Sequence, residues 1–302
     1  MNVVRLRFSV PVLAGVLALS SCATFSNDSA RVGDRALSDS ELDALIVGYA
    51  SSGGDTDVTG PQDAALARNL LTTWITTEVT LDLVAREGGS VNDADLAAAT
   101  EKLDAASGFA DAAESVRALF IRNEAARTVL GSLMAPPDDE LRSLYESGPS
   151  DSGVVCVRAI LTDSKEEIDT ATLRLLGGES FADVAAEVSI DPSKAEGGAL
   201  TGEGGSACID YASVVEGVAP QFVDALEATR VDTISTAFEI PGTGWAIVLP
   251  RPFDEVADDV RALIGGQAAA SATSAALASA DVWVSARVGR WNPATAVVEK
   301  LG

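Results

Sequence analysis

The chain has 302 residues and a formal charge of −24 at pH 7, because 45 acidic side chains outnumber 21 basic ones. Nucleic acid and anionic lipid headgroups are poor partners for so acidic a chain, and we interpret its carboxylates, which are spread along the chain, as a solvated surface. The absence of histidine excludes a histidine-dependent triad and removes the most common metal ligand. We therefore predict no metal and no cofactor.

Residues 1–21 have the layout of a secretory signal. Arg5 and Arg7 precede an apolar run over residues 8–19, which is too short to cross a bilayer because a span takes about 20 apolar residues. The segment then ends in Leu-Ser-Ser-Cys22, which resembles the bacterial lipobox, where the cysteine is acylated and becomes the new N-terminus. We predict lipid on Cys22 and an extracytoplasmic, membrane-anchored location. An ordinary signal peptide followed by a chance cysteine is the alternative.

The next segment is predicted to be a tether followed by a helical module. Residues 22–35 are rich in Ser, Asn and Asp and lack an apolar period, which indicates a flexible lipidated tether. Ser38 and Glu41 fit a capping box, so a helix should begin there. Apolar residues recur at helical spacing in four later stretches: 62–87, 92–103, 110–133 and 138–145. We therefore predict a helical module over residues 36–150.

Mixed α and β patterns begin at Val154. Strand-like runs are predicted at residues 154–161, 233–240 and 244–249, and helices at residues 165–176, 181–188 and 220–228. The resulting β-α-α-α-β-β order predicts a small sheet with helices on its faces. We assign this domain to residues 151–252.

The last part, residues 253–302, is predicted to complete the helical module. An Ala-rich helical stretch over residues 253–278 is interrupted by Gly265-Gly266, and residues 281–284 alternate like an edge strand. This part has too little apolar surface to fold alone, so we expect it to pack on the N-terminal helices. The predicted fold class is α+β, with the mixed domain inserted between the two parts of the helical module.

Two cysteines remain besides Cys22. Cys156 and Cys208 would lie in an oxidising compartment, where a disulfide persists, and we predict that they are bonded. On the chain-entropy model a loop of that length contributes roughly 4 kcal/mol of stability. Two separate buried thiols are the alternative.

The order of these pieces resembles the SurA and PrsA group of extracytoplasmic folding factors, in which a helical chaperone module carries a parvulin-type peptidyl-prolyl isomerase (rotamase) domain. The resemblance covers about residues 154–250. Its most specific segments are Arg158-Ala159-Ile160-Leu161, residues 178–185, residues 189–200, Pro220-Gln221-Phe222 and Gly244-Trp245-Ala246-Ile247. The resemblance implies a chaperone whose partners are unfolded or nascent secreted proteins and their proline-containing segments.

By the same resemblance, Leu200, Val218 and Phe222 form the wall of a proline-binding pocket, and Asp191 lies beside the susceptible carbonyl as the candidate catalytic residue. The isomerase task is to lower a rotational barrier of ~18–20 kcal/mol without breaking bonds, so an apolar pocket that favours the twisted amide is what helps. Plain core packing is the alternative for the three apolar residues. For Asp191 the alternative is a turn residue before a proline.

The sequence departs from the family at the pocket floor. The family usually has two histidines there, at the positions held by Ala159 and Ala246, and the usual threonine near the last turn aligns with Pro241. The paired loss removes the hydrogen-bond network that normally braces the site. By this interpretation the disulfide replaces part of that structural role, and the site is degenerate.

Three functional hypotheses follow. The first is a membrane-tethered folding factor that binds unfolded secreted chains and has weak or no isomerase activity. The second keeps the fold but is a fully active peptidyl-prolyl isomerase, since no chemical step demands histidine. The third is an envelope interaction protein that uses the fold to bind one defined partner.

Overall fold

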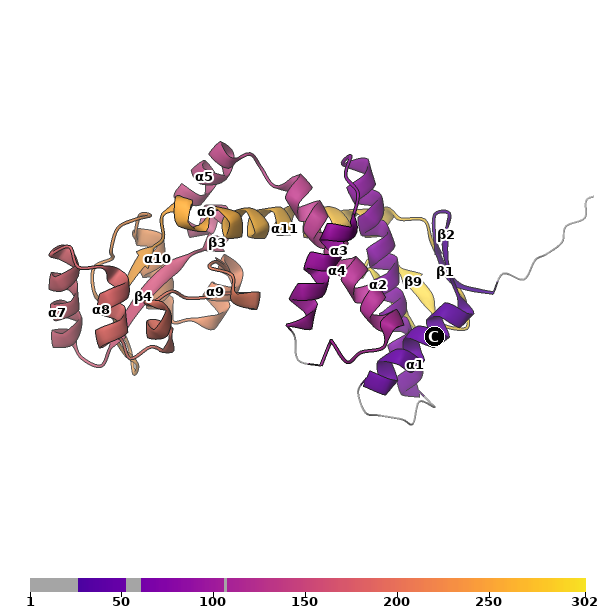
Figure 1. Cartoon of the computed structure of the whole chain (residues 1–302), viewed down its shortest axis with the longest axis horizontal. Helices are drawn as coiled ribbons and strands as arrows, with labels where there is room; N and C mark the ends of the chain where they lie inside the picture. Colours follow the sequence, from indigo (N-terminus) through magenta and orange to yellow (C-terminus); the bar gives the residue numbers. More distant parts are fainter. Residues whose placement is uncertain (1–26, 53–60, 106–107) are drawn as a thin grey trace, which may run out of the picture.

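The computed structural model describes residues 27–52, 61–105 and 108–302, so the predicted signal and the lipid site at Cys22 lie outside the described residues. The chain is an α+β protein with two lobes joined by one long helix, α11 (Phe253–Ser279) (Figure 1). None of the helices in the described ranges is both long and apolar enough to cross a membrane.

The helical lobe is built from four helices and the second half of α11. The four are α1 (Asp39–Ser52), α2 (Pro61–Arg86), α3 (Asp93–Asp104) and α4 (Glu114–Met134). Leu70, Leu71 and Ile75 of α2 are at most 2% exposed and form the centre of its core. The predicted capping box is confirmed, because the Ser38 amide donates to Glu41 Oε2 at 2.8 Å and the Glu41 amide donates to Ser38 Oγ at 3.3 Å.

A buried carboxylate ties three elements of this lobe together. The side chain of Glu78, on α2, is 2% exposed and lies between two arginines. Arg35 Nε is 2.8 Å from one carboxylate oxygen, and Arg122 Nη1, from α4, is 2.7 Å from the other. Arg35 Nη2 also donates to the Glu78 carbonyl at 2.8 Å. Two cations thus compensate a charge that would otherwise be costly to bury.

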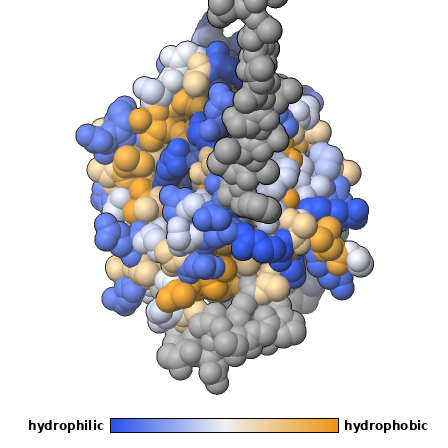
Figure 2. Space-filling view, turned by 90° about the vertical axis from the view of Figure 1, so that its right-hand side faces the viewer, coloured by the Kyte–Doolittle hydropathy of each residue, from blue (hydrophilic) through white to orange (hydrophobic). Residues whose placement is uncertain are grey.

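A small antiparallel sheet joins the two ends of the described chain. Its order is β2-β1-β8, with β1 (Asp28–Val32), β2 (Arg35–Ser38) and β8 (Val282–Val284). The predicted tether over residues 22–35 is therefore wrong from Asp28 onward, and β8 is the edge strand that the alternation predicts. The strand signal in β1 is short, and Ala30 and Val32 are buried in the core of the helical lobe, with β2 and β8 on the two sides of β1. Figure 2 looks onto this end of the molecule.

A C-terminal hairpin closes the same lobe. It consists of β9 (Arg290–Asn292) and β10 (Val297–Glu299), which pair antiparallel. The Val298 amide donates to Thr72 Oγ1 of α2 at 3.0 Å, and the Val298 side chain is 6% exposed. The hairpin is thus fixed to the longest helix of the N-terminal part.

The α/β lobe is organised by a three-stranded antiparallel sheet of order β4-β7-β6. The strands are β4 (Val157–Thr162), β7 (Gly244–Pro250) and β6 (Phe238–Ile240). The strand predicted over residues 233–240 is wrong in its first half. Just before this segment, Asp232 turns the backbone with φ of 60°. Ser235 then replaces regular strand pairing with two hydrogen bonds to β7: its amide donates to the Val248 carbonyl at 2.9 Å, and its Oγ accepts from the Val248 amide at 3.0 Å.

Helices cover both faces of this sheet. One face packs against α7 (Lys165–Leu176) and α8 (Phe181–Val188), and the other against α10 (Pro220–Ala228) and α9 (Tyr211–Gly217), a helix that the sequence pattern does not predict. The short elements are α5 (Asp138–Glu146), α6 (Pro149–Ser152), β3 (Val154–Val155), β5 (Ile209–Asp210) and the 3-10 turns η1 (Pro192–Glu196) and η2 (Glu203–Gly205). Strands β3 and β5 pair with each other beside the main sheet.

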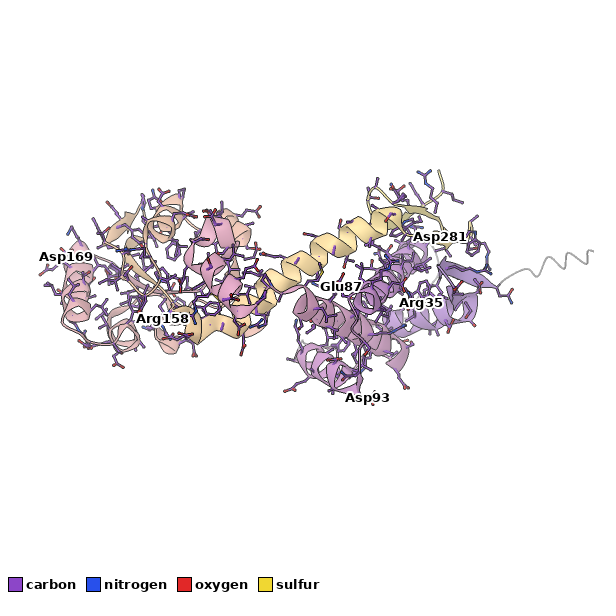
Figure 3. The ribbon with its side chains drawn as sticks, turned by 90° about the horizontal axis from the view of Figure 1, so that it is seen from above. Arg35, Glu87, Asp93, Arg158, Asp169 and Asp281 are labelled. Atoms are coloured by element: carbon purple, nitrogen blue, oxygen red, sulfur yellow. A yellow bond between two sulfur atoms is a disulfide. The ribbon has the colours of Figure 1, made fainter. Side chains whose placement is uncertain are left out.

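Helix α11 is continuous, so the predicted interruption at Gly265-Gly266 is wrong (Figure 3). The first half packs its Val256 and Val260 in one core with α5 and the two cysteines, and the second half packs Ala269 against Leu130 of α4. A Cβ atom on Gly265 would lie 2.2 Å from the Gly131 carbonyl oxygen. Gly265 therefore allows close backbone contact between α11 and α4, and the packing gained there outweighs its weak helix propensity.

Candidate functional site

The disulfide fixes the loop that follows Leu200, one of the predicted site residues. Cys156 and Cys208 are bonded, with their Cα atoms 4.2 Å apart, which confirms the predicted pair. Cys156 separates β3 from β4, and Cys208 directly precedes β5, and both are at most 2% exposed. The bond therefore holds the loop that follows Leu200 against the first strand of the lobe.

The loop that carries Cys208 is also held by α11. Asp259 Oδ1 accepts hydrogen bonds from Ser206 Oγ at 2.8 Å and from the Ala207 amide at 2.9 Å. Farther along α11, Gln267 Nε2 donates to Asp210 Oδ2 at 2.8 Å. The residues around Cys208 thus connect the helix between the lobes with the wall of the candidate site.

Two alanines lie on the floor of the site. Ala159 is opposite Val248 and Ala246 is opposite Leu161 in the β4–β7 ladder, so both alanines face the same side of the sheet. They are 6% and 1% exposed. Since neither side chain can donate or accept a hydrogen bond, the floor is apolar at both of these positions.

The structure brings Leu200 and Phe222 to this face, where they pack in one cluster with Ala159. Phe222 is 8% exposed, and its ring meets that of Phe238 edge-on with centroids 6.2 Å apart. Val218, the C-cap residue that follows α9, is 37% exposed and is not part of the cluster. Of the three predicted wall residues, two are therefore in the packed face and the third lies outside it.

Asp191 has a local role. It is the N-cap of η1, and its Oδ1 accepts a hydrogen bond from the Ser193 amide at 2.8 Å. The preceding Ile190 amide donates to the Leu161 carbonyl at 2.8 Å, which places Asp191 near the end of β4. This geometry is that of a turn residue before a proline, and the contact engages one oxygen of the candidate catalytic carboxylate.

The same apolar cluster also includes Ile209, Tyr211, Val214 and Phe238. Sequence reasoning missed them. Phe238 lies in a predicted strand, and the alternation of apolar residues there could have identified it. Ile209 lies in β5, which is too short to show such an alternation. A hydrogen bond to Glu227 raises the pKa of Tyr211 above its usual value, because the carboxylate favours the protonated phenol.

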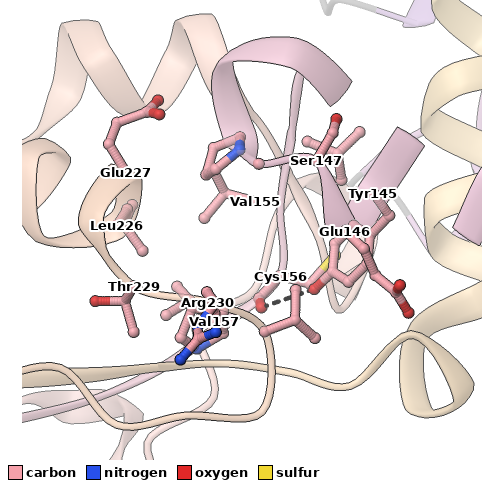
Figure 4. Close-up of a pocket in the computed structure, with 15 residues that line it drawn as sticks. Tyr145, Glu146, Ser147, Val155, Cys156, Val157, Leu226, Glu227, Thr229 and Arg230 are labelled. Atoms are coloured by element: carbon pink, nitrogen blue, oxygen red, sulfur yellow. Dashed lines mark hydrogen bonds between the residues drawn. The ribbon is translucent and has the colours of Figure 1, made fainter. Parts of the chain in front are cut away.

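Two cavities lie beside this face, and neither is lined by Asp191, Leu200, Val218 or Phe222. The first holds about 90 Å³ between the α5–α6 junction, β3, β4 and the end of α10 (Figure 4). At its edge Tyr145 donates its hydroxyl to the Arg251 carbonyl at 2.8 Å, and burial raises the pKa of this phenol. The second is an open groove of about 750 Å³ along α10 and residues 229–236.

These cavities share Thr229 and Arg230. Both therefore meet at the C-terminal end of α10, outside the predicted proline pocket. In the described ranges, no group of three or more cysteine, aspartate or glutamate side chains is arranged to hold a metal ion. The predicted floor and the two packed wall residues offer apolar contact, and Tyr211 adds one phenol to the same face.

Comparison with known proteins gives similarity at the level of solved structures. No protein-family model and no curated protein sequence matches the chain. PrsA from Bacillus subtilis is 16% identical over 80% of this chain and 86% of its own, with a TM-score of 0.32. The foldase protein PrsA from Streptococcus pneumoniae is 14% identical over 83% and 91%, also with a TM-score of 0.32.

A SurA-like chaperone from Campylobacter jejuni is 18% identical over 81% of this chain and 93% of its own, with a TM-score of 0.27. With TM-scores this low, the likeness alone says nothing about what the site of this chain does. The chain is similar to the PrsA and SurA-like foldases.

Proposed function

We propose that this chain is an extracytoplasmic protein-folding factor that binds unfolded or nascent secreted proteins, including their proline-containing segments. One observation carries the proposal. Motif segments that are far apart in the sequence supply Ala159, Leu200 and Phe222 to one apolar face of the α/β lobe. Such a face suits a prolyl or other apolar side chain, because burial of apolar surface is the dominant favourable term in most protein association.

The isomerase activity of this proposed factor is weak or absent. Rotation about a prolyl amide is accelerated only by interactions that are stronger in the twisted state than in the planar one. Ala159 and Ala246 offer no polar group to that state, and Asp191 Oδ1 is engaged by the Ser193 amide. Apolar contacts without a polar partner stabilise the planar and twisted amides about equally. Such a site binds a prolyl segment without accelerating its isomerisation.

The proposed location is the outer side of the cell membrane, with lipid on Cys22 as the anchor. The signal-like residues 1–21 support export, and the Cys156–Cys208 disulfide suits an oxidising compartment. The anchor would keep the binding lobes where secreted chains emerge.

The test is a paired assay on the chain without residues 1–22, which retains every described element. We expect it to suppress the aggregation of an unfolded client at stoichiometric amounts. We also expect it to leave the isomerisation of an Xaa-Pro peptide near its spontaneous rate, which corresponds to tens to hundreds of seconds. Phe222→Ala should weaken suppression, and Phe181→Ala, at an equally buried phenylalanine on the other face of the same sheet, is the matched control.

Other outcomes would select the alternatives. Fast isomerisation that disappears in Phe222→Ala would make the protein a true isomerase. Failure to suppress aggregation, together with one dominant crosslinked partner in intact cells, would favour an envelope interaction protein.

A further inference from the structure

The described chain begins at a defined corner of the helical lobe. The Asn27 carbonyl accepts a hydrogen bond from the Asp39 amide at 2.7 Å, at the start of α1. Two residues later, the Ser29 carbonyl accepts from the Ser285 amide at 2.9 Å. The segment that precedes β1 therefore leaves the lobe beside the turn that follows β8. This corner is at the opposite end of the molecule from the α/β lobe (Figure 1).

The length of chain before this corner is short. Five residue steps separate Cys22 from Asn27, and a fully extended chain covers at most about 3.6 Å per residue, or roughly 18 Å in all. A lipid on Cys22 would therefore keep this corner close to the bilayer surface, whatever path the intervening residues take.

The side chains around the corner suit a lipid interface. Trp283 is 46% exposed and pairs across the sheet with Arg31, whose guanidinium lies 5.6 Å from the centre of the indole ring. Arg31 forms an ion pair with Asp28 and Arg287 forms one with Asp39, and the two arginine side chains are 47% and 67% exposed. Tryptophan and arginine combine an apolar body with a polar end, which is the character of residues at membrane surfaces.

Charge is distributed unevenly between this end and the rest of the molecule. Residues 28–39 and 281–302 together contain five basic and five acidic side chains, so this end has no net charge, whereas residues 40–280 contain 14 basic and 40 acidic ones. An anionic membrane surface would repel the acidic remainder of the molecule but not the end at which the chain emerges. This repulsion acts over a screening length of about 10 Å. Figure 2 shows hydrophilic and hydrophobic side chains interleaved on this end.

We propose that Arg31, Trp283 and Arg287, which we call the Trp283 face, lie on the surface of an anionic phospholipid bilayer. This inference rests on the proposed lipid anchor at Cys22. In this orientation the helical lobe is next to the membrane, and α11 carries the α/β lobe away from it. The candidate site then points toward the space in which secreted chains fold.

The test uses the full-length lipidated chain on vesicles of phosphatidylcholine and phosphatidylglycerol, half of them made with brominated phosphatidylcholine. We expect the bromine atoms to quench tryptophan fluorescence in the wild type and most of this quenching to be lost in Trp283→Phe. Trp245→Phe, in the α/β lobe, is the matched control and should keep the quenching. Arg31→Gln with Arg287→Gln should reduce it, as should added salt.

Flotation of the vesicles separates the two proposals. Wild type that floats, with Cys22→Ser that does not, supports the anchor, and equal quenching in wild type and Trp283→Phe would then overturn the Trp283 face alone. Wild type that does not float would overturn the anchor and the face together. A dye at position 176, where Leu176 is 72% exposed on α7, should transfer little energy to a dye on the bilayer surface. Strong transfer from that position would also overturn the orientation.

Discussion

The two lobes hold distant segments together by different means. In the helical lobe, the buried Glu78 carboxylate joins α2 to Arg35 of β2 and Arg122 of α4, so the bond between elements is electrostatic. In the α/β lobe the Cys156–Cys208 disulfide joins the first strand to the loop before β5. The ion pairs are lost when the arginines are replaced, and the disulfide is lost when it is reduced. Each lobe can therefore be weakened separately.

The largest effect is expected in the α/β lobe. Cys156→Ser with Cys208→Ser releases a loop of 52 residues, and the chain-entropy model assigns about 4 kcal/mol to a loop of this length. We expect the free energy of unfolding, measured by urea denaturation, to fall by about this amount. Reduction of the wild type should have the same effect on this lobe and should leave the double variant unchanged. An unaltered midpoint would show that the disulfide contributes no stability.

The matching change in the helical lobe is Arg35→Gln with Arg122→Gln. It leaves the Glu78 carboxylate buried without a cation, and breaking a buried pair in this way costs roughly 3 kcal/mol or more. Urea denaturation followed by the fluorescence of Trp74, which is buried in this lobe, measures the change. Glu78→Gln added to the double variant should recover part of the loss. A double variant as stable as the wild type would mean that the ion pairs do not hold this lobe together.

A smaller effect is expected where α5 meets the α/β lobe. Tyr145→Phe removes the hydroxyl that donates to the Arg251 carbonyl at 2.8 Å, and a lost buried hydrogen bond costs about 1–2 kcal/mol. Thermal unfolding at pH 7 measures this loss, and Tyr49→Phe, at a 47% exposed site on α1, is the control.

Alkaline pH tests the same phenol. Burial raises the pKa of Tyr145 above the ordinary tyrosine value of 10.0, so the folded state keeps the proton more tightly than the unfolded state. This contribution is complete below pH 10 and decreases as the pH rises toward the raised folded pKa. We expect the stability advantage of the wild type over Tyr145→Phe to shrink over that range. A constant difference would contradict the shift.

The smallest effect is expected at the start of α1. Ser38→Ala removes a helix cap and costs about 1 kcal/mol, measured by urea denaturation. Hydrogen bonds from the Ser38 side chain and amide lower the pKa of Glu41 below 4.5, so the charged carboxylate is favoured in the folded state. Its contribution is complete above the unfolded pKa and is lost as the pH falls through the folded one. The difference between wild type and variant should therefore narrow under acid conditions.

Local sequence patterns predicted the helices and strands that show a regular spacing of apolar residues within their own sequence. The capping box at Ser38, the helices α2, α4, α7 and α8, and the strand β7 all follow from spacing and terminal signals. The disulfide followed from counting cysteines in a chain that the sequence predicts to be exported. The apolar character of the site floor also followed from the sequence, because Ala159 and Ala246 are alanine whatever the fold around them.

Tertiary structure decided everything that depends on a distant partner. Strand β1 (Asp28–Val32) becomes the centre of a three-stranded sheet because β8 pairs with it from the other end of the chain, and Gly265 lies against the backbone of α4. Phe222 is buried because Phe238 and Leu226 pack around it, whereas Val218, which follows the last residue of α9, stays outside that cluster. A local pattern records only the preferences of neighbouring residues, whereas these outcomes depend on surfaces that meet only after the chain has folded.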